Sequence, residues 1–151
     1  MAESTAWLLP LQGAWRAAVG EWELVHLIEA PVLVDIPVTP FYCRQVLLWE
    51  NRILPVLDLA VWLAGQPLAP RDQMLAGIFA YQAQSEAALS YGILLLDGVP
   101  TRQVVHDEEA CALPAEPMGW QKVAISCFGD GDSAVPILDL PYIFSGALLT
   151  D

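Results

Sequence analysis

The segment Pro55-Val-Leu-Asp-Leu-Ala-Val-Trp-Leu-Ala-Gly65 has a second copy near the end of the chain, Pro136-Ile-Leu-Asp-Leu-Pro-Tyr-Ile-Phe-Ser-Gly146. The two copies are identical at five of eleven positions, without a gap. In each, a short apolar run leads to an aspartate that can cap a helix of about two turns, and a glycine can end that helix. The repeat therefore predicts two similar strand-rich halves, although capping signals are common enough to leave coincidence open.

Outward from the repeat, short apolar runs alternate with turn residues, which is typical of a β protein. We expect strands at residues 7–11, 14–19, 46–49, 53–57, 75–81, 91–96, 101–105, 122–128 and 134–138. Residues 21–29 fit a helical turn leading into a strand, and periodicity alone does not decide between helix and strand. Prolines at positions 31, 37 and 40 predict a loop with at most one edge strand.

Composition excludes several classes of function. The chain has 151 residues, a formal net charge of −12 and a single lysine, Lys122, so a phosphate backbone would repel it and nucleic-acid binding is not expected. Hydrophobic residues make up 56% of the chain, but no apolar run approaches the roughly 20 residues that span a bilayer. We therefore expect no membrane insertion, and the apolar excess predicts an interaction surface.

The side chains that usually carry chemistry are few and scattered. Cys43, Cys111 and Cys127 form no C-x-x-C pair, and neither histidine lies at metal-ligand spacing, so we expect no metal, no cofactor and no enzymatic activity. Three free thiols and an N-terminus without a signal peptide suggest a cytoplasmic protein. Asp58 and Asp139 precede apolar helices, so N-capping explains them better than an acid/base pair does.

Four segments, in order, resemble the CheW-like domain family. Ile53-Leu-Pro-Val-Leu-Asp-Leu59 is close to the family's Ile-Pro-Val-Ile-Asp-Leu, and Pro40-Phe-Tyr-Cys-Arg-Gln-Val-Leu-Leu48 is similar to the approach that precedes it. Tyr91-Gly-Ile-Leu-Leu-Leu-Asp-Gly-Val99 is similar to the family's Gly-x-Leu-Val-Asp-x-Val strand, and Val135-Pro-Ile-Leu-Asp-Leu140 to its closing segment. The Trp7 and Trp15 strands, with Leu24 to Ile28, also resemble the family's opening strands and short helix. No single piece is highly specific, but the ordered set spans nearly the whole chain.

The resemblance implies one domain over residues 1–151, all-β, with two small SH3-like five-stranded barrels packed together. The chain would pass from the first barrel to the second and return, with short helices after the repeated Pro-x-Leu-Asp-Leu segments. It also implies a non-catalytic adaptor that couples a chemoreceptor-type protein to a CheA-type histidine kinase, in chemotaxis, type IV pilus or other chemosensory signalling. The sequence leaves self-association open.

The chain departs from the family where partner contacts are expected. The family's Asn-Leu-Arg-Gly positions hold Leu48-Trp-Glu-Asn51 here, which replaces the arginine by Glu50 and reverses its charge. His26 stands where the family has a glutamate. This predicts a divergent partner, although an ordinary solvated turn explains Glu50 as well. The residues that the resemblance assigns to partner binding are His26, Arg44, Trp49, Glu50, Asn51 and Arg52.

Two other functions compete with the adaptor. A stand-alone β-barrel that senses a small apolar ligand would also use the apolar excess and the six tryptophans, and it requires a large closed cavity. A small hydrolase would need a polar cleft around a histidine, and the sequence offers no such grouping. Two barrels filled by side chains, with an exposed groove, would favour the adaptor.

Overall fold

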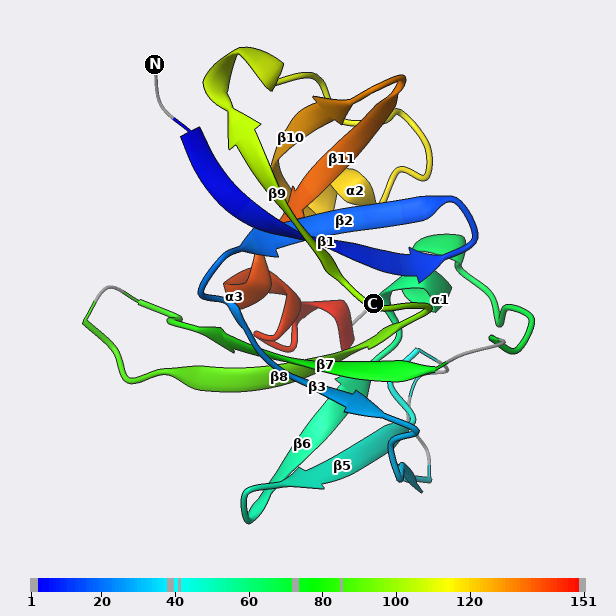
Figure 1. Ribbon diagram of the computed structural model, residues 1–151. Coiled ribbons are helices and arrows are strands. Elements are labelled where there is room, and N and C mark those ends of the chain that lie inside the picture. The colour runs from blue at the N-terminus through cyan, green and yellow to red at the C-terminus, as the bar shows by residue number, and fades with distance from the viewer. Residues whose placement is uncertain (1–2, 38–39, 41, 72–73, 85, 150–151) are drawn as a thin grey trace.

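Two β-sheets form the body of the protein, one above the other in Figure 1, in a computed structural model that describes residues 3–37, 40, 42–71, 74–84 and 86–149. The strands are β1 (Glu3–Gln12), β2 (Trp15–Gly20), β3 (Leu24–Glu29), β4 (Val34–Asp35), β5 (Gln45–Trp49), β6 (Arg52–Leu57), β7 (Leu75–Tyr81), β8 (Ser90–Leu96), β9 (Thr101–His106), β10 (Ala124–Asp130) and β11 (Ser133–Leu138). One sheet has five strands in the order β10-β11-β2-β1-β9, and the other has six in the order β3-β7-β8-β6-β5-β4.

Short helices fill the space between the sheets and close their ends. They are α1 (Leu59–Ala64), α2 (Trp120–Val123), α3 (Leu140–Ile143) and the 3-10 turns η1 (Asp107–Glu109) and η2 (Ala147–Leu149). The main core lies between the two sheets and includes α1 and α3, while a smaller apolar cluster fills the inside of each sheet. The predicted all-β fold of two packed subdomains is confirmed, with the two-residue strand β4 added to the second.

Each sheet is built from both halves of the chain, and each half ends with one copy of the repeat. The first half gives the β1–β2 hairpin to the five-stranded sheet and β3, β5 and β6 to the other. The second half gives β7–β8 to the six-stranded sheet and β9, β10 and β11 to the five-stranded one. The order β10-β11-β2-β1-β9 matches β5-β6-β8-β7-β3, and β11 and β6 each make the sheet's parallel pair, with β2 and β8. Neither sheet is complete without strands from both halves of the chain.

The repeated aspartates begin the two helices in the same way. The Asp58 carboxylate accepts the Val61 N–H, and the Asp139 carboxylate accepts the Tyr142 N–H, each at 3.3 Å. Gly65 ends α1 in the left-handed conformation, with φ of 73°. The aspartate satisfies a backbone N–H at the start of the helix in both copies. The glycine ends the helix only in the first copy, because α3 ends at Ile143, before Gly146. The repeat therefore encodes two strand-to-helix corners that begin alike.

Residues 122–123 are the clearest local difference from the sequence expectation. They belong to α2 rather than to the strand predicted over 122–128, which starts at Ala124. Trp120 and Val123 are both buried in the main core, and residues three apart share one face of a helix but opposite faces of a strand. Residues 21–23 form a turn before β3, and β4 is the one strand in the described part of the proline-rich loop.

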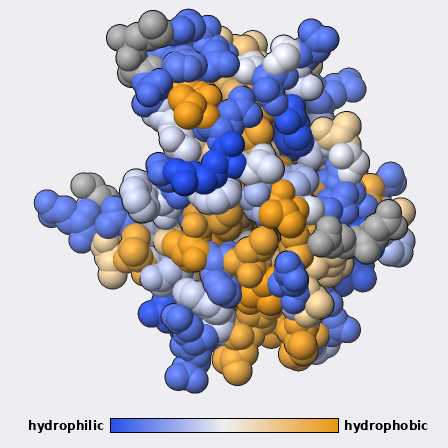
Figure 2. Space-filling model, viewed as in Figure 1, coloured by the Kyte–Doolittle hydropathy of each residue, from blue (hydrophilic) through white to orange (hydrophobic). Residues whose placement is uncertain are grey.

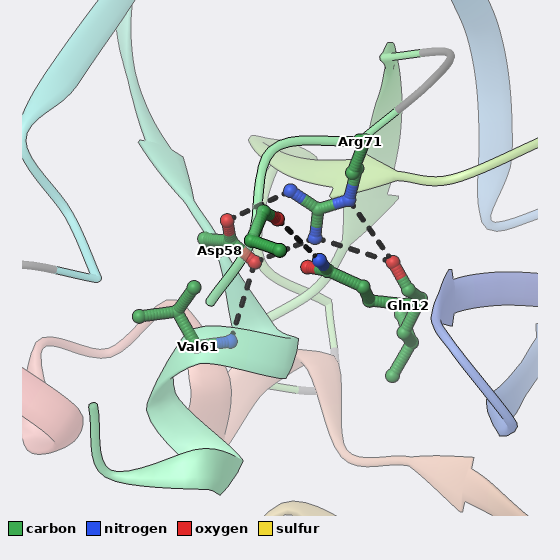
Figure 3. A network of polar contacts seen from close by, with 6 residues as sticks. Gln12, Asp58, Val61 and Arg71 are labelled. Atoms are coloured by element: carbon green, nitrogen blue, oxygen red, sulfur yellow. Dashed lines mark hydrogen bonds and ion pairs between the residues drawn. The ribbon is translucent and has the colours of Figure 1, made fainter. Parts of the chain in front are cut away.

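A buried ion pair joins the two sheets through the first repeat copy (Figure 3). The Arg71 guanidinium donates to both carboxylate oxygens of Asp58, at 2.8 and 2.9 Å, and its Nε and Nη2 both donate to the Leu11 carbonyl at 3.2 Å. The Arg71 side chain is 3% exposed and that of Asp58 is 16% exposed. Because Leu11 lies on β1 and Asp58 follows β6, this pair fixes the spacing between the sheets.

We predict that Arg71→Met lowers the free energy of unfolding by about 3 kcal/mol, because it leaves the Asp58 carboxylate poorly solvated and without its cation. Arg16→Met is the matched control. It removes an ion pair with Asp130 that has one hydrogen bond and whose two side chains are 35% and 34% exposed. The free energy of unfolding should therefore fall by less than about 1 kcal/mol. Urea denaturation measures both, and equal losses would contradict the role assigned to Arg71.

The second repeat copy has an acidic neighbour in place of a cation. Burial raises the pKa of Glu23 above its ordinary value of 4.5, an effect that the Gly20 N–H opposes and the nearby Asp139 carboxylate increases. The native state then binds more protons than the unfolded chain between pH 4.5 and the raised pKa, so stability falls as pH rises through that interval.

Glu23→Gln should therefore stabilise the protein relative to wild type above this interval, while the difference shrinks towards acid pH. Glutamine keeps an oxygen that can accept the Gly20 N–H, which the Glu23 carboxylate accepts at 2.7 Å. Unfolding free energies of the two proteins, measured by urea titration from pH 4 to pH 8, test this. A difference that does not change with pH would contradict the proposed penalty.

Candidate protein-interaction surface

The turn between β5 and β6 projects two polar side chains from the end of the six-stranded sheet. Glu50 and Asn51 have φ of 49° and 63°, the left-handed pair of dihedrals that a two-residue type I′ hairpin needs. Asparagine tolerates this conformation well and glutamate poorly. Both residues are exposed, so the turn presents the Glu50 carboxylate to solvent at the tip of the hairpin.

One face of the same hairpin is apolar and uncovered. Leu48 is 69% exposed and Ile53 is 72% exposed, and they are paired directly across the two strands. The pairs Val34–Val46 and Val46–Pro55 continue this face onto β4. We call these five residues the hairpin face. Figure 2 shows apolar side chains gathered over the six-stranded half of the molecule, whereas the other half is mostly polar in this view.

The opposite face of the hairpin is also apolar, but it is buried. Leu47 and Leu54 point into the cluster inside the six-stranded sheet, where they are 4% and 9% exposed. The run Val46-Leu-Leu-Trp49 therefore does not alternate between apolar and polar residues, unlike a strand with one solvated face. That missing alternation indicates that both faces of the hairpin are apolar, but it does not say which face the rest of the chain covers.

Trp49 and Arg52, which pair across the hairpin beside its tip, both pack on Tyr91. The Trp49 and Tyr91 rings lie 5.2 Å apart between centroids, and the Arg52 guanidinium lies 4.8 Å from the centroid of the Tyr91 ring. This arrangement is a cation–π contact that holds the arginine against the sheet. Trp49 is thus half-buried, and the structure brings it together with Glu50, Asn51 and Arg52 in one cluster.

The remaining residues assigned to partner binding lie elsewhere. Arg44 is exposed just before β5, and His26 is exposed on β3, which is separated from β5 by three strands in the sheet order. His26 is therefore not placed beside the hairpin tip by the sheet. Among the six tryptophans, Trp22 is 85% exposed and lies in the turn before β3, so it is far more accessible than Trp49.

A pocket of about 280 Å³ adjoins the hairpin face, because Pro55 lines both. Tyr81, Tyr91 and Phe144 contribute aromatic walls, and the Tyr81 and Phe144 rings stack at 5.4 Å. A Cβ at Gly92 would come within 2.5 Å of the Phe144 ring, so glycine lets this ring lie on the β8 backbone. The sheet and α3 thus form an apolar groove beside the exposed hairpin.

Within the described ranges, no three histidine, cysteine or acidic side chains gather in a way that could hold a metal ion. The helices of that part of the chain are also too short or too polar to cross a bilayer. What the site presents is an apolar face, an aromatic groove and a charged tip.

Comparison with known proteins identifies the fold. No protein-family model matches the sequence, and no curated protein matches it. Among solved structures, the scaffolding protein CheW from Thermoanaerobacter tengcongensis superposes with a TM-score of 0.69, over 91% of this chain and 90% of that chain, at 14% sequence identity. The resemblance seen in the ordered sequence segments is therefore confirmed at the level of the fold, and the protein has a CheW-like fold.

Proposed function

We propose that the protein is a non-catalytic adaptor that couples a chemoreceptor-type protein to a CheA-type histidine kinase in a chemosensory pathway. The observation that carries this proposal is the hairpin face, an apolar surface left uncovered on a fold shared with a scaffolding protein. Its partners would be a kinase domain, a receptor tip or both, and the pathway would be chemotaxis or a type IV pilus system. The protein would act in the cytoplasm.

The hairpin face can supply the binding energy. Full burial of a leucine or isoleucine side chain is worth about 1.5–3 kcal/mol. Leu48 and Ile53 are 69% and 72% exposed, so most of this burial energy is available for binding a partner. Association has its own entropic costs, so this face alone fits weak or moderate binding. The adjoining aromatic groove adds contact area, as adaptors that hold two partners require.

The charged tip would select the partner. An exposed charge at an interface rim contributes little affinity, but a like charge opposite it disfavours the wrong partner strongly. Glu50 stands where the family resemblance places an arginine, so the matching partner surface should carry a basic residue. Arg52 does not restore the original pattern, because its guanidinium packs on Tyr91.

The ligand-sensing alternative has weaker support. The insides of both sheets hold clusters of buried apolar side chains, which leaves little room for a guest molecule. A pocket of about 470 Å³ lies at one end of the five-stranded sheet, but the exposed residues Ser4 and Asp107 are in its lining. It is an open depression rather than the closed cavity that a sensor of apolar ligands requires.

Binding of the purified chain to a CheA-type kinase and to a receptor tip, both from its own organism, tests the proposal. We expect binding to at least one of them, and about tenfold weaker binding for Ile53→Thr, which makes the hairpin face more polar. Ile125→Thr is the matched control, since Ile125 is 67% exposed on a strand of the other sheet. Calorimetry gives the affinities; no binding to either protein would contradict the adaptor.

Glu50→Arg should change partner choice without unfolding the protein. The residue is exposed at the tip, so the substitution leaves the core unaltered, while the reversed charge should repel the native partner and favour surfaces that are acidic. Co-purification from the native cell, wild type against variant, measures the change, and circular dichroism checks the fold. Glu108→Arg makes the same charge change in η1 and should leave recovery unaltered. Equal recovery in all three would remove Glu50 from the interface.

A further inference from the structure

Cys111 and Cys127 lie side by side although 16 residues separate them in the chain. The segment that follows η1 runs back along β10, where Ala110 pairs with Phe128 and the Cys111 N–H donates to the Cys127 carbonyl at 3.1 Å. The two Sγ atoms are 3.5 Å apart. Cys127 is 2% exposed, whereas Cys111 is exposed to solvent.

The backbone at this pair suits a disulfide. Directly opposed residues on antiparallel strands have Cα atoms about 4.5–5.5 Å apart, which lies inside the usual range for disulfides of about 4.4–6.8 Å. Bond formation requires the sulfurs to approach from 3.5 Å to about 2.0 Å, which small rotations of the two side chains can achieve.

The first half of the chain shows what the same position looks like without sulfur. There Val34 on β4 pairs with Val46 on β5, and Val46 pairs with Pro55, which opens the first repeat copy. Cys127 pairs with Pro136, which opens the second copy, so Cys111 and Cys127 stand where the first half has two valines. Ordinary apolar side chains satisfy the packing there, so packing alone does not call for two thiols.

We propose that Cys111 and Cys127 form a reversible dithiol–disulfide site whose oxidant is a low-molecular-weight disulfide such as glutathione disulfide. The exposed Cys111 thiolate attacks one sulfur of the oxidant, which releases one thiolate and leaves a mixed disulfide on Cys111. The Cys127 thiolate then attacks the Cys111 sulfur and releases the second. Two protein thiols are oxidised, one external disulfide is reduced to two thiols, and the two protons go to solvent or to those thiols.

The burial difference sets the order of the two attacks. Cys127 is a poor first nucleophile because burial raises its pKa to about 12, an increase to which the hydrogen bond and the charge of Cys111 add. Once Cys111 carries a mixed disulfide, it has no thiolate, so the repulsive charge is gone and Cys127 is easier to ionise. Exposed Cys111 would therefore react first and Cys127 would resolve the intermediate.

Oxidation would close the edge of the five-stranded sheet covalently. Ala110, Cys127 and Phe128 belong to the lining of the open depression at the end of this sheet, so the bond would fix one of its walls. It would also tie the segment between η1 and α2 covalently to β10, to which the hydrogen bond from the Cys111 N–H to the Cys127 carbonyl already connects it. The site lies on the other sheet from the hairpin face and does not depend on the adaptor role.

The test is a redox titration of the full chain with reduced and oxidised glutathione, followed by acid quench, alkylation in denaturant and peptide mass spectrometry. We expect a Cys111–Cys127 crosslink at oxidising ratios, full reversal by excess reduced glutathione, and an increase in Tm of roughly 5–10 °C. Cys43, which is buried and has no such neighbour, should stay alkylatable in the denaturant throughout.

Two variants separate the steps. Cys43→Ala should leave the crosslink unchanged, and Cys127→Ala should stop the reaction at a mixed disulfide of Cys111 with glutathione. The proposal is overturned if wild type accumulates that mixed disulfide without forming the crosslink, or if neither cysteine reacts. Both of these outcomes are measured on the wild-type protein, so the test does not depend on whether the variants fold.

Discussion

The Asp58 carboxylate connects the two sheets and sets their position relative to each other. It starts α1, takes both arms of the Arg71 guanidinium, and through that guanidinium is connected to the Leu11 carbonyl on β1. The backbone N–H of Asp58 donates to the Tyr42 carbonyl at 2.8 Å, so the segment before β5 is held at the same place. A buried ion pair adds little net stability over an apolar contact, but it penalises every arrangement that separates the charges. In a fold whose halves exchange strands, that penalty specifies how the sheets meet.

Because the two sheets are held firmly together, the fold can leave one apolar part of its surface exposed. The β5–β6 hairpin has Leu47 and Leu54 in the inner cluster and Leu48 and Ile53 outside, so the inner face holds the strands while the outer face is free for a partner. Such apolar exposure is a liability unless solubility comes from elsewhere. The net charge of −12 provides it, and the polar tip at Glu50 limits which surfaces can approach.

Local signals in the sequence were enough for the elements that local chemistry determines. The capped corners at Asp58 and Asp139 and the Glu50-Asn51 turn depend on residues within one turn of each other, and the ordered strands resembled a known family. The helical turn at Trp120 was missed because its four residues are too few for a period to be read, and only the core shows that Trp120 and Val123 are both buried. The Arg71 pairing and the exposure of Leu48 were also out of reach, since both depend on which segments from distant parts of the chain cover a position.

The two halves of the chain show how equivalent hairpins can serve different purposes. In the first, the outer pair of the hairpin is Leu48 and Ile53; in the second, the corresponding pair is Gly129 and Ala134, which have almost no side-chain surface to offer. The backbone pairing is the same, so the contrast lies in the side chains alone. Selection for strand pairing would not place large exposed apolar groups in one copy and remove them from the other. The asymmetry therefore supports the first hairpin, rather than the second, as the proposed binding surface.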